Sequence, residues 1–238
     1  MEMIKVKNYE QLSERATNII LETVNNNEEP VLGLATGATP EKLYENLIEK
    51  NKNGEVTFKN VTTFNLDEYV GLSGEDENSY RYFMNKNLFD HIDIQKDKTF
   101  IPNGLAENLE LECEAYEKLI KSHGKINVQI LGLGLNGHIG FNEPGTPFDK
   151  RTHIVELDDV TRSANARFFE RLEDVPTQAL TMGIGTIMEA EKIILLVQGE
   201  KKSAILHEVV HGPVTENVPA SILQNHPNVT IITDIDIK

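Results

Sequence analysis

Short apolar runs alternate along the chain with segments whose apolar residues recur at helical spacing, and this alternation restricts the fold to the α/β class. The apolar runs have the length and composition of strands that are buried on both faces. We predict strands at 31–35, 61–65, 126–131, 193–197 and 229–232. The predicted helices are 12–24, 39–48, 79–89, 109–120 and 201–210. Strands separated by helices require crossover connections, so we expect an open, mainly parallel sheet with helices on both faces, in a three-layer, Rossmann-like arrangement.

The length of 238 residues fits one domain, and no internal repeat, low-complexity tract or Pro/Ser-rich linker divides the chain. We therefore expect a single α/β domain over 1–238. Lys and Arg total 23, Asp and Glu total 38, and the net charge is −15. This charge argues against nucleic acid and anionic membranes as partners, because both attract clustered cations. It does not exclude a small substrate with one phosphate group, which needs only a helix N-terminus, an Arg and a Lys in one cleft.

The sequence also predicts a compartment. The first residues contain no apolar stretch like that of a secretory signal, and the longest aliphatic run, 193–197, is too short to span a bilayer. The single cysteine, Cys113, excludes a disulfide framework. It lies in a predicted helix, where we expect it to be buried as a small hydrophobic residue. These features predict a cytoplasmic protein.

Polar or glycine-rich loops follow four of the predicted strands. They are the turn at 36–39, the segment with Asp67, the loop with His138 and the segment with Lys202. In open α/β sheets, ligands bind outside the carboxyl ends of the strands, and these ends meet at one edge when the strands are parallel. Ordinary turn chemistry explains the Gly and Thr residues of these loops, but it explains Asp67 and His138 poorly. The sequence therefore predicts a ligand site at this edge.

The turn Thr36-Gly37-Ala38-Thr39 leads into a predicted helix, with Thr39 as N-cap and Pro40 at the first helical position. Free N–H groups and the helix dipole at such a point favour one phosphate group. The turn lacks the Gly-Lys-Ser/Thr ending of a nucleotide-triphosphate loop. Simple capping by Thr39 is an alternative explanation of the same residues, and the two are compatible.

Two segments carry groups suited to proton transfer. Asp67 follows a predicted strand, where its carboxylate is placed to take a carbon-bound proton from a substrate; the alternative is a capping or surface acid. His138 lies between glycines and suits a proton shuttle near neutral pH, with Glu143 or Asn136 orienting its ring. A structural histidine is the alternative, but the flanking glycines, which let a ligand approach the backbone, favour function.

Three arginines, Arg162, Arg167 and Arg171, recur near helical spacing, so that one of them is placed to hold an anion while the others face solvent. Taken alone, these residues predict an α/β enzyme for a small phosphorylated substrate. It would use a carboxylate base and a histidine shuttle, and it would require no metal. They do not define the reaction.

Two further motifs predict other functions. The spacing Gly132-x-Gly134-x-x-Gly137 matches the dinucleotide fingerprint, but Pro144 follows too soon for the long helix that this fingerprint needs. The segment 207–211 matches HExxH, which on a helix places two histidines as zinc ligands with a glutamate as base. Gly and Pro end that helix at once and no third ligand is evident, so a zinc hydrolase remains the less favoured alternative.

Six segments resemble the glucosamine-6-phosphate deaminase (isomerising) family in its short form. The string HIGFNEP, within 131–144, is the most specific of them and differs from the corresponding segment of the 6-phosphogluconolactonases, which share the fold. A lactonase-like sugar-lactone esterase is the nearest alternative, and a sugar-phosphate-sensing module is a non-enzymatic one. The matching segments are 32–40, 64–71, 78–84, 131–144, 161–169 and 179–189.

The resemblance implies an enzyme of amino-sugar catabolism and N-acetylglucosamine utilisation that converts glucosamine 6-phosphate into fructose 6-phosphate and ammonia without a cofactor. Asp67 would move a proton between C2 and C1 of the open-chain sugar. His138 would assist ring opening, supported by Asn136 and Glu143. The 6-phosphate would be held by Thr36, Gly37, Ala38, Thr39, Arg167 and Lys202.

The chain departs from the family pattern at three places. Many members carry Asp at position 136, where this chain has Asn, so we expect Glu143 to supply the charge that stabilises the imidazolium. Ala38 stands where a second Gly is common and is compatible with the turn if its φ stays negative. The chain ends shortly after its last predicted strand, without the C-terminal extension of the allosteric hexamers. We therefore expect a monomer or a small homo-oligomer.

Overall fold

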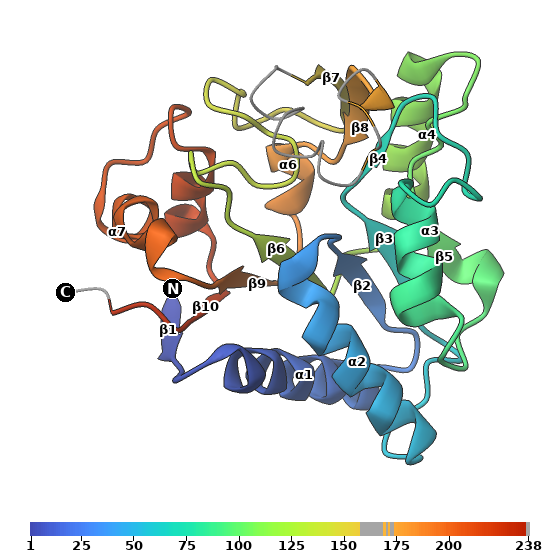
Figure 1. The fold of residues 1–238 in the computed structure, drawn as a ribbon, viewed down its shortest axis with the longest axis horizontal. Coiled ribbons are helices and arrows are strands. Elements are labelled where there is room, and N and C mark those ends of the chain that lie inside the picture. The colour runs from blue at the N-terminus through green and yellow to red at the C-terminus, as the bar shows by residue number, and fades with distance from the viewer. Residues whose placement is uncertain (158–168, 170, 172–173, 237–238) are drawn as a thin grey trace.

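The computed structural model describes residues 1–157, 169, 171 and 174–236. Its main sheet contains seven strands in the spatial order β1-β10-β9-β6-β2-β3-β5, and every pairing in it is parallel (Figure 1). The strands are β1 (Glu2–Lys5), β2 (Val31–Leu34), β3 (Thr62–Asn65), β5 (Thr99–Phe100), β6 (Val128–Gly132), β9 (Lys192–Val197) and β10 (Val229–Thr233). The expected open, parallel sheet is confirmed.

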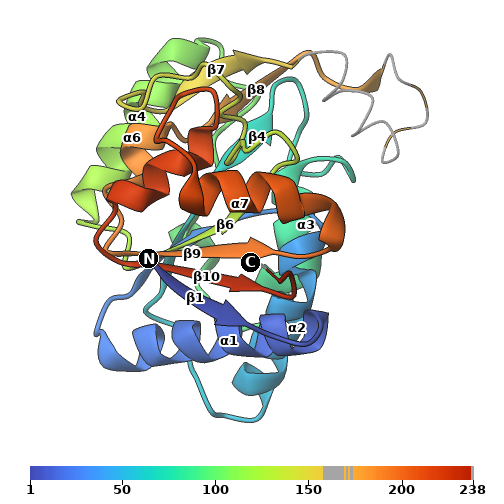
Figure 2. The same ribbon diagram turned by 90° about the vertical axis from the view of Figure 1, so that its left-hand side faces the viewer.

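Helices cover both faces of this sheet. Helices α1 and α2 lie on one face, and α4, α6 and α7 lie on the other (Figure 2). The helices are α1 (Tyr9–Asn26), α2 (Ala38–Lys52), α3 (Tyr80–Met84), α4 (Leu109–Ser122), α6 (Ile184–Ile187) and α7 (Ser203–His211). Short 3-10 helices span Lys96–Lys98, Glu200–Lys202 and Pro219–Asn225. The three-layer prediction is confirmed, and among the described residues no helix is long and apolar enough to cross a membrane.

Helix α1 shows why the periodic segments fold as predicted. Asn8 accepts a hydrogen bond from the Gln11 N–H at 3.0 Å and so caps the helix N-terminus. The helix then buries Leu12, Ala16 and Ile20 against the sheet, which is the apolar stripe that defines an amphipathic helix.

Helix α4 follows the same rules. It is capped by Asn108 and buries the Cys113 side chain, as predicted. Burial is the main reason that the pKa of the Cys113 thiol is raised to about 11.

A second sheet of three antiparallel strands was not expected from the sequence. Its order is β4 (Asp67–Tyr69), β8 (Gln178–Thr181), β7 (His153–Glu156), and it lies on the same side of the main sheet as α4 and α6 (Figures 1 and 2). Asp67 therefore lies in a short strand and not in the polar loop that we predicted. Strand β4 is too short to show a period of two, and only pairing with the distant β8 makes it a strand.

The structure corrects three local predictions. The helix predicted at 79–89 divides into α3 and a π-helical turn at Asn85–Phe89. The helix predicted at 201–210 begins as a 3-10 turn and becomes α-helical only at Ser203. Thr39 is not an N-cap, because α2 already begins at Ala38 with Gly37 in the capping position.

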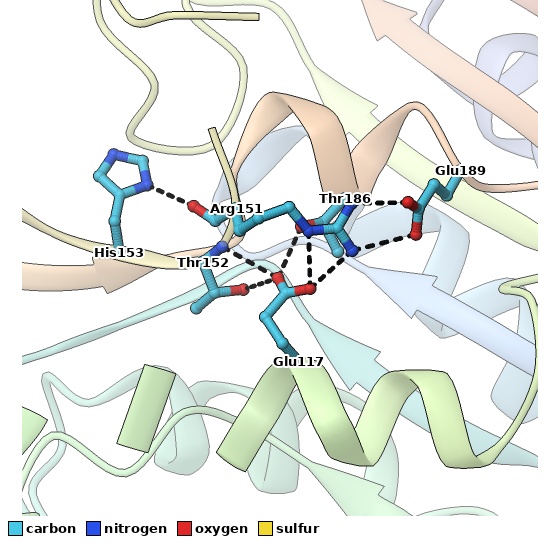
Figure 3. A network of polar contacts seen from close by, with 6 residues as sticks. All are labelled: Glu117, Arg151, Thr152, His153, Thr186 and Glu189. Carbon is cyan, nitrogen blue, oxygen red and sulfur yellow. Dashed lines mark hydrogen bonds and ion pairs between the residues drawn. The ribbon is translucent and has the colours of Figure 1, made fainter. Parts of the chain in front are cut away.

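A half-buried glutamate of α4 joins this helix to the start of β7 and to α6 (Figure 3). Glu117 of α4 accepts hydrogen bonds from the Thr152 N–H and hydroxyl at 2.9 and 2.5 Å and from the Thr186 hydroxyl at 2.6 Å. Arg151 donates to Glu117 at 2.7 Å and to Glu189 at 2.7 Å. Burial alone would raise the pKa of the Glu117 carboxyl, but the hydrogen-bond donors have the larger effect, so that its pKa lies below the ordinary value. The network fixes the beginning of β7 between α4 and α6.

Candidate active site

The turn between β2 and α2 leaves the helix N-terminus uncapped. Gly37 has a φ of 98°, a left-handed conformation that favours glycine, and no side chain accepts a hydrogen bond as N-cap of α2. Among the described residues no residue other than glycine has a positive φ, so Ala38 meets the condition that we set for it. The first N–H groups of α2 and its dipole therefore remain available to an anion.

This turn forms one wall of a cleft of ≈ 520 Å³. The cleft is lined by Thr36, Gly37, Ala38, Glu41, Tyr69, Glu77, Asn78, Ser79, Tyr80, Phe83 and Phe169. The ring of Tyr69 lies 4.8 Å from that of Tyr80 and 6.0 Å from those of Phe141 and Phe169, measured between ring centroids. The sequence did not indicate this aromatic wall, because its rings come from segments far apart in the chain.

Asp67 lies against the loop that carries His138. Asp67 is only 7% exposed, and its backbone pairs with that of Thr181 in β8. A methyl group placed on Gly140 would lie 3.7 Å from Oδ2 of Asp67 and 3.0 Å from the Thr181 hydroxyl. Burial, and secondarily the charge of Glu68, raise the pKa of Asp67 to about 8. Such a carboxyl group both accepts and returns protons near neutral pH.

The structure brings Asn136, His138 and Glu143 together. Nδ1 of His138 lies 3.2 Å from Oε1 of Glu143, within ion-pair distance but without the alignment of a hydrogen bond. The Asn136 amide donates to the other Glu143 oxygen at 2.5 Å, and its carbonyl accepts the His138 N–H at 3.1 Å. Asn136 therefore holds the carboxylate, and the carboxylate faces the imidazole. The three residues that the sequence grouped lie together, with Glu143 as the carboxylate beside the ring.

The glycines of the apparent dinucleotide fingerprint have a different use. A side chain on Gly134 would overlap the imidazole of His138, and one on Gly137, whose φ is 87°, would press on Val218. The segment after β6 contains turns and an isolated bridge between Ile139 and Asn142, and no helix begins in it. A pyrophosphate site needs a helix N-terminus at this point, so the structure gives the dinucleotide fingerprint no support, and Gly134 makes room for the imidazole.

Of the four cationic residues that the sequence singled out, the structure describes only Lys202 and Arg171. Lys202 ends the 3-10 turn after β9 and is half-buried, and burial lowers the pKa of its ammonium group. It does not line the cleft described above. Arg162 and Arg167 lie outside the described residues, and Arg171 pairs with Asp174 at 2.7 Å on the surface.

The HExxH segment does not form a metal site in the described part of the chain. His207 and His211 lie on α7 with their rings 5.0 Å apart, and both side chains are exposed. Among the described residues, no group of three His, Cys, Asp or Glu side chains is arranged to hold a metal ion. A catalytic zinc site needs three protein ligands, so the zinc alternative finds no support here.

Comparison with known proteins finds relatives that match nearly the whole chain. The family model described as glucosamine-6-phosphate isomerases/6-phosphogluconolactonase matches residues 5–232. A glucosamine-6-phosphate deaminase of Shouchella clausii is 56% identical over 234 residues, covering 98% of this chain and 95% of the relative. One of Clostridium perfringens is 51% identical over 236 residues, covering 99% of this chain and 98% of the relative.

Solved structures of known proteins also align with nearly the whole chain. A monomeric glucosamine-6-phosphate deaminase aligns with a TM-score of 0.96 and 47% identity over 98% of this chain and 97% of its own. A 6-phosphogluconolactonase of Thermotoga maritima aligns with a TM-score of 0.78 but only 18% identity, over 98% of each chain, and so shares the fold.

Proposed function

This chain belongs to the family of glucosamine-6-phosphate isomerases and 6-phosphogluconolactonases, and from that premise we propose that it is a glucosamine-6-phosphate deaminase of amino-sugar catabolism. One observation carries the proposal: Asp67, with a pKa of about 8, lies against the loop on which Asn136 and Glu143 hold His138. That arrangement supplies a base for a carbon acid and a separate group for ring opening. The lactonases, by contrast, are similar in fold alone.

The 6-phosphate binds at the turn 36–39. The uncapped N–H groups of α2 face this position, and the left-handed Gly37 brings the backbone close to the ligand. Lys202 is assigned to the 6-phosphate by family resemblance; partial burial lowers the pKa of its ammonium group, and a bound anion would raise that pKa. Family resemblance also assigns Arg167 to the 6-phosphate of the substrate.

His138 opens the pyranose ring. It carries a proton between the C1 hydroxyl and the ring oxygen, and the imidazolium formed in transit is stabilised by Glu143. Asn136 keeps that carboxylate facing Nδ1. An aspartate at position 136 would itself be charged. Asn136 is neutral, but it donates a hydrogen bond to Glu143, which carries the negative charge.

Asp67 then performs the isomerisation. Its carboxylate removes the proton from C2 of the open-chain aldehyde, and the C1 oxygen takes up a proton to give an enolamine. The proton is then returned to C1 while the nitrogen gives up one proton, so that the C2 amine becomes an imine. Water adds to the imine, and its collapse releases ammonia and fructose 6-phosphate. These steps are proton transfers and one addition of water, and the residues named here supply the acids and bases for them.

Ammonia release tests the proposal. The protein is incubated with glucosamine 6-phosphate in the presence of EDTA, and ammonia and fructose 6-phosphate are measured together. We expect equal amounts of both products. Absence of ammonia refutes the deaminase, hydrolysis of 6-phosphogluconolactone instead supports the esterase, and loss of activity only with EDTA restores the zinc alternative. We further propose that the chain forms a single domain and that the protein is a monomer or a small homo-oligomer. Sedimentation of the same sample tests the oligomeric state.

A further inference from the structure

Glu68, the residue after Asp67, is a buried carboxylate that connects two elements of the cleft. It is 3% exposed. One oxygen accepts the N–H groups of Tyr69 at 2.8 Å and Tyr80 at 2.9 Å, and the other accepts the N–H of Arg81 at 2.9 Å. The last two donors are the first residues of α3, so a side chain of β4 occupies the N-terminus of that helix.

We propose that Glu68 is a positioning residue for the reaction, which ties the strand of Asp67 to the start of α3 and keeps a fixed negative charge beside the catalytic carboxyl. The inference rests on the proposed function, because it assigns to Asp67 the role of base. Glu68 itself touches neither substrate nor the reacting atoms.

The first part of the role is geometric. Tyr69 and Tyr80 are the two cleft residues whose N–H groups bind Glu68, and their rings contact each other at 4.8 Å. The Ser79 hydroxyl caps α3 by accepting the Tyr82 N–H at 3.0 Å, while the Glu68 carboxylate satisfies the donors that this cap leaves open. Glu68 therefore sets the distance between Asp67 and the aromatic wall.

The second part of the role is electrostatic. Three N–H donors favour the charged form of Glu68, whereas in the described part of the chain no hydrogen bond reaches the Asp67 carboxyl. Burial raises the pKa of Glu68. Its three N–H donors nevertheless stabilise its carboxylate, so that, of the neighbouring pair Asp67 and Glu68, Glu68 loses its proton first as the pH rises. Its charge then disfavours a second charge on Asp67, so that Asp67 stays a stronger base than an ordinary aspartate.

Other charged or titratable groups surround the pair. Tyr69 shares its strand, Tyr80 and Arg81 come from α3, and Tyr116 comes from α4. His138 and Glu143 stand on the loop that reaches Asp67 through Gly140. Of these groups, Arg81 supplies the cation near Glu68: its guanidinium donates to the Thr99 hydroxyl at 2.9 Å, and its charge lowers the pKa of Glu68.

The pH dependence of kcat/KM tests the proposal, since its acidic limb reports the base of the free enzyme. Glu68→Gln removes the negative charge, and we expect the acidic limb to move to lower pH by about one unit or more. Glu68→Asp keeps the charge, so its limb stays near that of the wild type while kcat falls. Arg81→Gln leaves Glu68 less compensated, and its limb should move the other way, to higher pH.

The matched control is Glu75→Gln, which removes an exposed carboxylate from the same segment and should leave the profile unchanged. A limb that stays in place in Glu68→Gln, with kcat/KM reduced equally at every pH, shows a merely structural residue and overturns the proposal. If Glu68→Gln does not fold, the direction of the shift in Arg81→Gln decides. A wild type without deaminase activity refutes the proposed function instead, so the two failures are distinguishable.

Discussion

Replacing Asp67 by Asn should stabilise the protein, and more so as the pH rises. The native carboxyl has a pKa of about 8 and an unperturbed value of 3.8. Between these values the native state keeps its proton while the unfolded state has lost it. The unfolded state then binds fewer protons, so the free energy of unfolding falls as the pH rises. The Asn variant has no carboxyl group at this position and escapes that decline.

The magnitude follows from the interval. One pKa unit corresponds to about 1.4 kcal/mol, so the full interval of about four units corresponds to at most ~6 kcal/mol, reached near pH 8. At pH 5 only about one unit has been crossed, which is about 1 kcal/mol. Relaxation of the protein around the new charge reduces such penalties, and we expect the advantage of Asp67→Asn to grow by about 2 kcal/mol from pH 5 to pH 8.

Urea unfolding of both proteins at pH 5, 6, 7 and 8 measures this difference. Asp93→Asn is the matched control: donors on Thr57, Phe58 and Asn51 outweigh burial and lower the pKa of Asp93, so its loss should destabilise the protein. An advantage of Asp67→Asn that is the same at every pH would refute the reasoning, because it would show that Asp67 is not held protonated by its surroundings.

Three further substitutions test other parts of the structure. Glu143→Gln should lower kcat by about 10- to 100-fold with little change in KM, because the His138 imidazolium loses its counter-charge; near-normal turnover would contradict this role. Gly134→Ala should displace the His138 ring and lower kcat by about 100-fold, with circular dichroism unchanged, whereas a fully active variant would show that the ring has other room. Glu117→Ala should cost about 2 kcal/mol of unfolding free energy, since the Thr152 and Thr186 hydroxyls lose a half-buried charged acceptor, and a loss below ~1 kcal/mol in urea would show that the network contributes little.

Strands β2, β6, β9 and β10 of the main sheet were predictable because they are short runs rich in Val, Ile and Leu that are buried on both faces. The edge strand β1 was missed, since Glu2–Lys5 has only two apolar residues between two charged ones and is largely exposed. Strand β5 has only two residues. The second sheet forms by pairing between Asp67–Tyr69 and Gln178–Thr181, and nothing local to either segment favours a strand there.

The site shows the same division. Asp67 and His138 stood out in the sequence because they follow strands whose carboxyl ends meet at one edge. The role of Gly134 was not predicted: its spacing matched a nucleotide motif that the sequence itself disfavours, and the overlap that requires glycine there arises only when the loop folds back on the imidazole. Glu68 was passed over as one acid among many, because its three donors become visible only when α3 packs on β4.

Ammonia release from glucosamine 6-phosphate deuterated at C2 tests the central claim most directly, with the wild type and Asp67→Asn compared at the same pH. If Asp67 moves the C2 proton, the wild type should release ammonia with a primary isotope effect. Asp67→Asn should lose turnover by about a thousandfold or more while it still binds phosphate at the turn 36–39. Ammonia release by Asp67→Asn at a rate near that of the wild type would contradict the account.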